Sequence, residues 1–295
     1  MSQDRAIDLK ANRVDTDATM AANSDLLIPS QKAVKSALDA SFVTLGTSGN
    51  LANERVFTAG NQVTVTDAGA GSTVTVDWSP NPLKMARFWT EGCSAGDFST
   101  LSAGTSAGVT ANTANSDSTH PGTLSASTGS TTTGRSSSCY IESSAIQFGT
   151  YAWRSVGCFK IPTLSDGTET FSVMIGFNDS YTSTTYTDCA CFRYQHSANS
   201  GKLECLTRSN STGSPTDSGV TVVADTWISY EIRVNAAGTS VQFYLNGSLV
   251  ATLSSDIPTG SSRVMGHGHN IVKSAGSTAR TLVTDCCLVE GLITR

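Results

Sequence analysis

Apolar residues occupy every second position in several segments of the second half of the chain, and this alternation restricts the fold more than any other feature. FSVMIGF at residues 171–177 and ISYEIRV at residues 228–234 each place apolar side chains on one face. SVQFYLNGSLVATL at residues 240–253 predicts a hairpin, because Asn246 and Gly247 separate two alternating runs and accept positive φ. Alternation of this kind is typical of strands. We therefore expect residues 89–295 to form a β-sandwich of two packed antiparallel sheets.

The composition argues against several classes of function. Charged residues make up 15% of the chain, below the roughly 25% of ordinary globular proteins. Lys and Arg form no cluster and the net charge is −5, so we expect no nucleic-acid partner. The chain has no run of about 18 apolar residues, and we expect no membrane insertion. Residues 1–5 lack the apolar stretch of a signal peptide, so we expect synthesis in the cytoplasm.

Residues 1–80 have a different pattern and are predicted to form a small N-terminal adaptor. IPSQKAVKSALDASF predicts a helix near residues 30–42, with Ser30 as N-cap and an apolar stripe of about two turns. This helix is either a surface helix of one subunit or part of a short bundle about an oligomer axis. Valine and threonine alternate around a Gly-rich turn and predict a hairpin near residues 54–78. The prolines of SPNP at residues 79–82 interrupt regular structure, and we place a linker at residues 81–88.

Three stretches resemble structural proteins of tailed bacteriophages. TDATMAANSDLLIPSQKAVKSALDA at residues 16–40 is similar to a segment near the N-termini of tail-fibre proteins. NLANERVFTAGNQVTVTDAGAGSTVTV at residues 50–76 resembles the β-hairpin module that often follows it. HPGTLSASTGSTTTG at residues 120–134 and NAAGTSVQFYLNGSLVATL at residues 235–253 resemble a concanavalin-like jelly roll, as do IPTG at 257–260 and NIVKSAGSTARTL at 270–282.

The resemblance implies a fibre or spike subunit of a phage virion that mediates attachment to the host surface. It implies a jelly roll displayed by the N-terminal adaptor, which would contact other virion proteins through residues 1–80. We expect a homotrimer, because a short helix and a lone hairpin gain most by surrounding a shared axis. The expected location is the virion, assembled in the host cytoplasm. The alternatives are a capsid decoration or head-fibre protein, and a glycan-cleaving tailspike.

The sequence offers no catalytic constellation. Retaining glycosidases need two carboxyl groups about 5–5.5 Å apart, and no acidic residues recur at positions i and i+2 within the predicted strands. A nucleophile elbow and a phosphate-binding loop are also missing from the sequence. We therefore expect a protein that is not an enzyme, with no cofactor and no catalytic residues.

The loop SYTSTTYT at residues 180–187 is the predicted glycan contact. Tyr181 and Tyr186 would offer flat apolar rings beside hydroxyl groups. Asp179 and Asp188 flank the loop and are the candidates for a calcium site. Solvent-exposed aromatic residues without a function are the alternative interpretation of the same loop.

The cysteines and histidines are the candidate metal ligands, although we predict no metal site. Eight cysteines occur without a CxxC pair or a Cys/His zinc spacing, which favours small buried thiols over a disulfide or a zinc site. His267 and His269 form a His-x-His pair whose rings would project to one side of an extended chain. Because glycines flank both histidines, we expect a polar turn there, with metal binding as the alternative.

Overall fold

The computed structural model describes residues 14–15, 28–29, 43–44, 55–56, 63–67, 74–78, 85–91, 99–111, 118–195 and 198–293. The chain divides into two units, Met1–Asn81 and Pro82–Arg295, which are described separately below. Among the described residues, no helix has the length and apolar character needed to cross a membrane.

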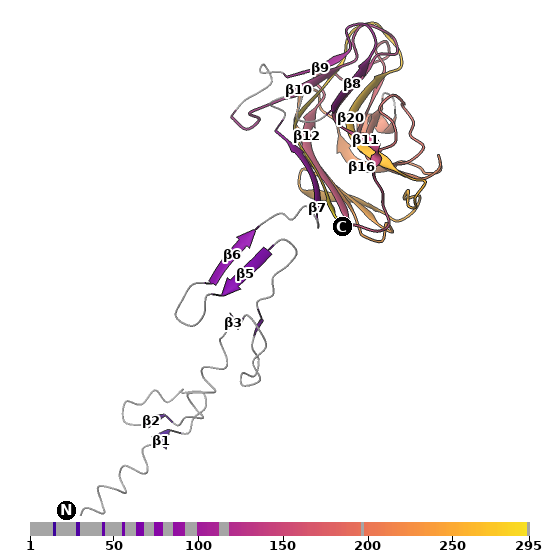
Figure 1. Ribbon diagram of the computed structural model, residues 1–295. Coiled ribbons are helices and arrows are strands. Elements are labelled where there is room, and N and C mark those ends of the chain that lie inside the picture. Colours follow the sequence, from indigo (N-terminus) through magenta and orange to yellow (C-terminus); the bar gives the residue numbers. More distant parts are fainter. Residues whose placement is uncertain are drawn as a thin grey trace, which may run out of the picture. The chain divides into compact units, whose positions relative to one another are not determined.

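The N-terminal unit contains short paired strands (Figure 1). β1 (Val14–Asp15) pairs in parallel with β2 (Ile28–Pro29), and β3 (Val43–Thr44) pairs in parallel with β4 (Arg55–Val56). β5 (Val63–Asp67) and β6 (Val74–Trp78) form an antiparallel pair in which Val65 lies opposite Val76. The helix that we predict near residues 30–42 lies outside the described residues.

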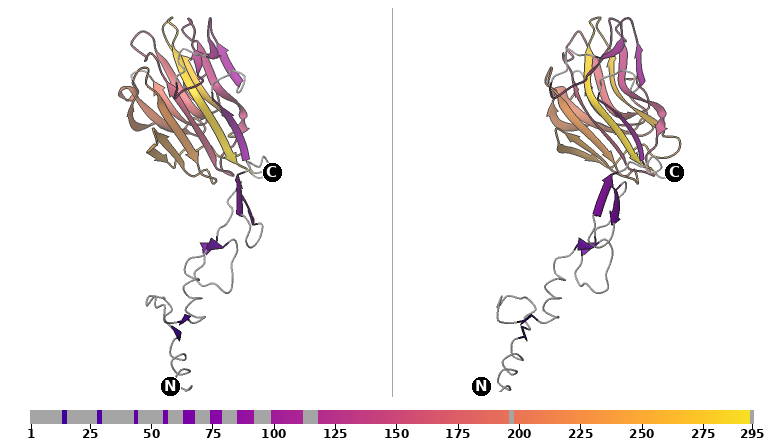
Figure 2. Two further views of the ribbon diagram at one scale, coloured as in Figure 1. Left: turned by 90° about the vertical axis from the view of Figure 1, so that its left-hand side faces the viewer. Right: turned by 60° about the vertical axis from the view of Figure 1, so that its left-hand side comes forward.

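The C-terminal unit is a sandwich of two antiparallel sheets, as the alternation predicts (Figures 1 and 2). Sheet I has the order β19 (Ser248–Leu253), β18 (Val241–Leu245), β17 (Ile228–Val234), β12 (Trp153–Lys160), β21 (Thr281–Leu292), β10 (Leu124–Ser127) and β9 (Gly108–Ala111), with β7 (Met85–Thr90) on the second half of β21. Sheet II has the order β16 (Thr216–Thr221), β15 (Lys202–Arg208), β14 (Cys189–Gln195), β13 (Phe171–Asn178), β20 (Met265–Lys273), β11 (Arg135–Ile146) and β8 (Ser99–Ala103). A single 3₁₀ turn, η2 (Asn199–Gly201), precedes β15.

The structure corrects the linker that we place at residues 81–88. Residues 85–88 are the first part of β7, which pairs with β21 from Met85 opposite Leu292 to Thr90 opposite Cys287. Only the first half of β21 pairs with β10, so its second half has a free edge on that side. β7 forms hydrogen bonds with the backbone groups of that edge. Strand pairing therefore begins at Met85, soon after the prolines of SPNP at residues 79–82, which interrupt regular structure.

The hairpin around Asn246 and Gly247 has the predicted register. β18 places Val241, Phe243 and Leu245 in the core and leaves the residues between them partly exposed. Asn246 and Gly247 have φ angles of 49° and 78°. Positive φ at both central residues twists the turn in the sense of the flanking strands.

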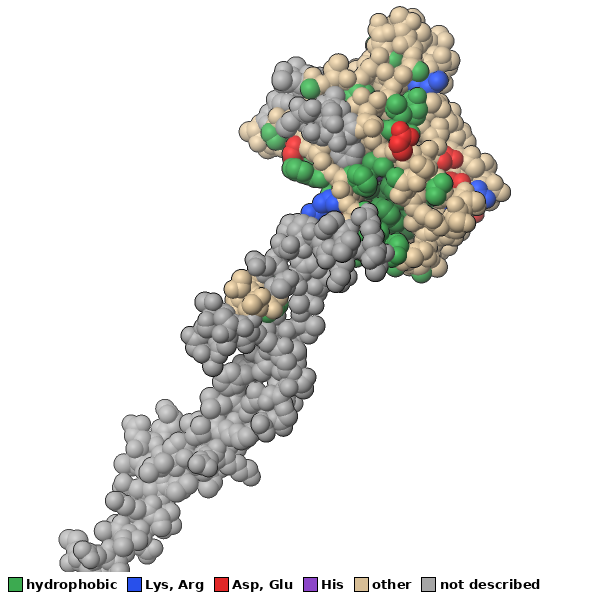
Figure 3. Space-filling view, viewed as in Figure 1, with side chains coloured by type: hydrophobic (Ala, Val, Ile, Leu, Met, Phe, Trp, Pro, Cys, Tyr) green, Lys and Arg blue, Asp and Glu red, His purple; other side chains and the backbone are tan. Residues whose placement is uncertain are grey.

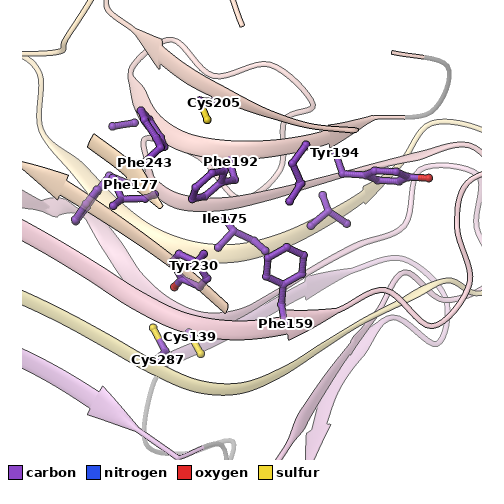
Figure 4. Close-up of a cluster of buried hydrophobic side chains, with 14 of the residues drawn as sticks. Cys139, Phe159, Ile175, Phe177, Phe192, Tyr194, Cys205, Tyr230, Phe243 and Cys287 are labelled. Atoms are coloured by element: carbon purple, nitrogen blue, oxygen red, sulfur yellow. The ribbon is translucent and has the colours of Figure 1, made fainter. Parts of the chain in front are cut away.

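The two inner faces enclose one large apolar core, part of which Figure 4 shows. β13 departs from one-sided burial, because residues on both of its faces are buried. On its outer face, Met174 packs in a second cluster with Tyr186, Cys189, Cys191 and Leu206. Tyr186 comes from the loop after β13, so that loop covers the outer face of sheet II.

Candidate functional site

The Gly-His-Gly-His run lies in β20 and not in the polar turn that we expect from its glycines. The side chains of His267 and His269 point between the sheets and are 0% exposed. Gly266 and Gly268 face the other side, where an added Cβ would lie 2.0 Å from the Ile141 carbonyl oxygen and 2.4 Å from an Asn270 side-chain oxygen, respectively. The glycines therefore serve close packing in a central strand, and the expectation of a turn was wrong.

Two bulges, one in each sheet, bring two cysteines to the same place. The register of β11 against β20 shifts after Ser138, where Cys139 has a φ of 52°. Ser138 and Cys139 consequently both face the core, and Ser138 Oγ lies 3.2 Å from Thr284 Oγ1 of β21. The register of β21 against β12 shifts between Thr284 and Cys287, so that these two residues also share the inner face. A bulge redirects a side chain in this way at the cost of local pairing.

Cys139, Cys287, His267 and His269 together form what we call the Cys–His cluster. The two sulfur atoms and one ring nitrogen of His269 lie within 4.8 Å of one another, and all three residues are buried. Figure 4 shows the two cysteines side by side, close to Tyr230. The Tyr230 hydroxyl is 2.6 Å from Nε2 of His269. Nδ1 of His269 is buried without a hydrogen-bond partner in the described part of the chain.

His267 lies at the edge of this cluster. Its Nδ1 is 3.2 Å from the Cys139 carbonyl oxygen and 4.0 Å from Cys287 Sγ. Its Nε2 is 2.8 Å from Ser155 Oγ, which in turn is 3.3 Å from the Tyr230 hydroxyl. The hydroxyl groups of sheet I thus fix the orientation of both imidazole rings of sheet II.

Burial and neighbouring groups shift the pKa values of His267, Cys139 and Cys287 in different directions. Burial lowers the pKa of His267 to about 3, so its ring is uncharged at neutral pH. The Cys287 thiol hydrogen-bonds to Cys139 and lowers the pKa of Cys139 to about 5, whereas burial raises the pKa of Cys287. Thiolate sulfur and neutral imidazole nitrogen are the ligands of zinc and related cations.

The other described cysteines are also free thiols. Cys189 and Cys191 belong to the outer cluster of sheet II, and Cys205 is buried in the main core. Cys158 and Cys286 are half-buried and are joined by a thiol hydrogen bond that lowers the pKa of Cys158. Cys93 lies outside the described residues.

The structure places the two predicted glycan-binding tyrosines in different environments. Tyr186 is 1% exposed and its hydroxyl is 2.5 Å from Nδ2 of Asn270, so its ring cannot offer a face to a ligand. Tyr181 is half-buried and its ring packs edge-on against Tyr140. The prediction missed the burial of Tyr186 because the loop folds back onto β13.

The carboxylates predicted for calcium have protein partners. Asp188 forms an ion pair with Arg263 at 3.2 Å and accepts a hydrogen bond from the backbone N–H of Asn210. Asp179 accepts a hydrogen bond from the backbone N–H of Asp188, and burial raises the pKa of Asp179. Each carboxylate thus stabilises the loop through protein contacts.

The outer face of sheet I carries a row of alternating charges across four strands. Arg87 of β7 binds Glu290 of β21 at 2.9 Å, and Glu290 binds Arg154 of β12 at 3.2 Å. Glu231 of β17 pairs with both Arg154 and Arg233. Although burial opposes the change, these arginines lower the pKa of Glu231. A general acid of a glycosidase needs a raised pKa, so Glu231 does not fit that role.

Aromatic residues gather around β7. The Trp89 side chain is on the outer face of sheet I and is 58% exposed, opposite the half-buried Leu288. Its neighbour Phe88 is 38% exposed and lies on the other face, at a surface hollow of about 260 Å³. The hollow is lined chiefly by Phe88, Gln147, Thr150, Tyr151, Trp153 and Ile293. Figure 3 shows hydrophobic side chains clustered on one face of this unit. We call Phe88, Trp89, Tyr151 and Trp153 the β7 aromatic site.

Sequence reasoning did not find this site. Phe88 is the last residue of the predicted linker, and Trp89 is the first residue of the predicted sandwich. Because these apolar residues are adjacent, they lack the alternation that marked other strands. Tyr151 and Trp153, in contrast, have the spacing of residues on one strand face. A search for aromatic pairs at this spacing would have found half of the site.

The comparisons with known proteins agree with the sandwich fold. No curated protein matches the sequence. The crystal structure of SO2946, a protein of unknown function from Shewanella oneidensis MR-1, matches with a TM-score of 0.55 at 13% identity, over 73% of this chain and 90% of that one. The endo-β-1,4-glucuronan lyase of the fungus Trichoderma reesei has a TM-score of 0.49 at 10% identity, over 68% and 94% of the two chains. Peanut lectin has a TM-score of 0.47 at 11% identity, over 72% and 100%.

Matches at these identities concern the fold alone, whereas the family model is matched by the sequence itself. The model that describes the C-terminal domain of SO2946-like proteins matches residues 119–285. That range begins just before β10 and ends within β21, so it includes Cys139, His267 and His269 of the Cys–His cluster, whereas Cys287 lies two residues beyond its end. The chain therefore belongs to the SO2946-like family through its C-terminal domain.

Proposed function

We propose that the protein is a subunit of a tailed-bacteriophage appendage whose β-sandwich binds a glycan on the host surface without cleaving it. Residues 1–80 would attach this domain to other virion proteins and assemble it as a homotrimer. The observation that carries the binding role is the β7 aromatic site, where Trp89 is 58% exposed on a regular strand. Exposed apolar side chains that lie close together on a rigid sheet commonly mark a binding surface.

The chemistry of this surface suits a sugar ring. The flat face of an indole packs against the C–H groups of a pyranose, and the guanidinium and carboxylate groups nearby hydrogen-bond to its hydroxyls. Arg87 lies two residues before Trp89 on β7, and Glu290 lies opposite Arg87 on β21. All three side chains are on the same face of the sheet. Because these two groups are paired with each other at 2.9 Å, they are held in place before a ligand arrives.

The hollow on the other face of β7 offers a second contact for the same ligand or its next residue. Trp153 is 6% exposed, so only an edge of its ring reaches the hollow, and its Nε1 donates a hydrogen bond to the Gln147 carbonyl oxygen at 2.9 Å. Phe88 and Tyr151 line the hollow with it, and Thr150 adds a polar group. A volume of about 260 Å³ is the size of a site for one sugar ring rather than for a drug-sized molecule. Single contacts of this kind are weak, and three linked copies would raise the avidity.

The arrangement of carboxylates supports binding over catalysis. Glu231 and Glu290 are each paired with two arginines, and the pKa of Glu231 is lowered by its two arginines although burial opposes the change. Neither has the apolar surroundings that make a carboxyl group a proton donor at neutral pH. A glycan-cleaving tailspike is the alternative that the experiment below distinguishes.

The test measures retention of the full-length protein on immobilised host-envelope polysaccharide, together with release of new reducing ends and of unsaturated products. Trp89→Ala should reduce retention at least tenfold, the loss of about 1.4 kcal/mol or more per site. Leu249→Ala removes an apolar side chain that is 52% exposed on β19 and is the matched control. Cleavage products would contradict the non-catalytic proposal. Equal retention of both variants would exclude the β7 aromatic site.

A capsid decoration or head-fibre protein remains the runner-up, because the same modules would serve on the shell. Gold-labelled protein imaged on virions by electron microscopy separates the two locations. Label on the tail supports the proposal. Label on the head, combined with a lack of glycan retention, would replace it with the structural role.

A further inference from the structure

We infer that Cys139, Cys287 and His269 bind one divalent, thiophilic metal ion between the two sheets, zinc by its chemistry, with His267 placed to supply the fourth ligand. The site is structural, since the four side chains come from the interior of a packed sandwich and leave no position for a substrate. Its donors come from β11, β20 and β21, so the ion would join sheet I to sheet II.

The distances are close to those of a tetrahedral site. In such a site, Zn–S bonds of about 2.3 Å and Zn–N bonds of about 2.1 Å separate neighbouring ligand atoms by about 3.6–3.8 Å. The two sulfurs and the His269 nitrogen lie within 4.8 Å of one another. Nδ1 of His267 is already 4.0 Å from Cys287 Sγ. Contraction by up to about 1 Å, well within side-chain motion, brings the two sulfurs and the His269 nitrogen to these separations. His267 lies beside Cys287 for the fourth position.

An unsatisfied atom points to a missing ligand. Nδ1 of His269 is fully buried and has no partner at ordinary hydrogen-bond distance in the described part of the chain, although His269 is close enough to Cys139 to help lower the pKa of that thiol. A buried polar atom without a partner costs roughly 1–3 kcal/mol, so proteins rarely retain one without a reason. The other nitrogen, Nε2, is engaged by the Tyr230 hydroxyl at 2.6 Å. Nδ1 is therefore the atom left for a metal ion.

The hydroxyl groups around the cluster act as the outer shell of a metal site. Ligating histidines commonly donate their second N–H to an oxygen, which fixes the tautomer and the ring orientation. Tyr230 would accept this bond from His269, and Ser155 would accept it from His267. His267 would exchange its hydrogen bond to the Cys139 carbonyl for the metal. Tyr230 and Ser155 are themselves buried, so both outer partners are fixed.

The charge of the complex fits the apolar surroundings. Two thiolate ligands would neutralise a divalent cation, and imidazole coordinates as an uncharged ring, so the liganded cluster would have no net charge. A single buried ion would carry a large desolvation cost. The rings of Phe177 and Tyr230 pack against the two histidines and enclose the cluster. Because the site closes only when both sheets are in place, the ion would bind during folding.

A disulfide between Cys139 and Cys287 is the rival use of the same sulfurs. It would leave Nδ1 of His269 unsatisfied, and it would not explain why two hydroxyl groups orient two imidazole rings toward the sulfurs. The bulge in each sheet, which directs the two sulfurs to the histidines, is explained by coordination of a shared ion.

The experiment uses the full-length protein, purified from cells grown with zinc and without chelators. Plasma mass spectrometry should find about one zinc ion per chain, and X-ray absorption should show two sulfur and two nitrogen neighbours. Substitution with Co²⁺ should give the intense visible bands of tetrahedral thiolate coordination. Cys287→Ser and His269→Gln should each lower the bound zinc at least tenfold.

Cys205→Ser is the control, because it replaces an equally buried cysteine elsewhere in the core, and it should retain the metal. Figure 4 shows Cys205 apart from the other two cysteines. If a variant does not fold, absorption spectroscopy on the wild type still decides the ligands. Metal-free protein, oxygen-only coordination or a Cys139–Cys287 disulfide in peptide mapping would each overturn the inference.

Discussion

Phe243 illustrates how single side chains stabilise this sandwich. It is 0% exposed in β18, and its ring packs edge-on against Phe192 of the opposite sheet at 5.2 Å between centroids. Its position follows from the register of one hairpin, since a shift by one residue would move the ring to solvent. The residue thus links a local turn signal to the main core.

Phe243→Ala should lower the free energy of unfolding by about 3–5 kcal/mol, because it removes a fully buried ring and leaves a cavity. Urea denaturation followed by tryptophan fluorescence measures the change. Val223→Ala alters a residue that is 57% exposed and should change stability by less than about 0.5 kcal/mol. A loss below about 1 kcal/mol at Phe243 would contradict the packing described above.

At the level of elements, the sequence predicted strands better than it predicted sites. Alternation identified β17, β18 and the turn at Asn246, because one-sided burial leaves a local signal, and it identified β13 by its inward-facing residues although both faces of that strand are buried. The bulge at Cys139 depends on the pairing of β11 with β20, and nothing in the local pattern around Cys139 shows it. The two histidines were misplaced for a related reason, since glycines that allow close packing and glycines that form turns look alike in a sequence.

Asp217 lies in β16 at the edge of sheet II, and its hydrogen bonds join β16 to β15 and η2. Asp217 accepts hydrogen bonds from Lys202 Nζ at 2.9 Å, from the Gly219 backbone N–H at 2.7 Å and from Asn199 Nδ2 at 3.0 Å. The bond from Lys202 is the largest of the effects that lower the pKa of Asp217 to about 2. A lowered pKa means that the carboxylate stabilises the fold above its ordinary pKa of 3.8, and that this contribution is lost as the pH falls through about 2.

Asp217→Asn should therefore be less stable than the wild type at pH 7, and the difference should shrink toward zero near pH 2. The effect is small because the group is exposed to solvent. Urea midpoints of both proteins across this pH range measure it, and Lys202→Met should reproduce most of the difference. A difference that stays constant down to pH 2 would show that the ion pair does not stabilise this edge.

At the scale of the whole molecule, the C-terminal sandwich and the described valines of β6 in the N-terminal unit differ in how far their apolar side chains are buried. The C-terminal unit encloses one continuous core between its sheets. In the N-terminal unit, Val74 and Val76 of β6 are 52% and 54% exposed. An isolated two-stranded pair is marginally stable in water, so a hairpin with open valines is a candidate for contact with other copies of itself.

The last prediction concerns the assembly that this difference implies. Light scattering of the full chain should give about three times its mass of 30.7 kDa. Residues 82–295 alone should be a folded monomer, because their strands bury their own apolar faces and do not depend on the hairpin.

Val74→Ser combined with Val76→Ser should weaken the full-length assembly, since the exposed valines would lose their apolar contact across the shared axis. The same thermal transition for the isolated sandwich and the full chain would support the independence of the domain. A full-length monomer at micromolar concentration would refute the trimer, and attachment through residues 1–80 would then require a different partner on the particle.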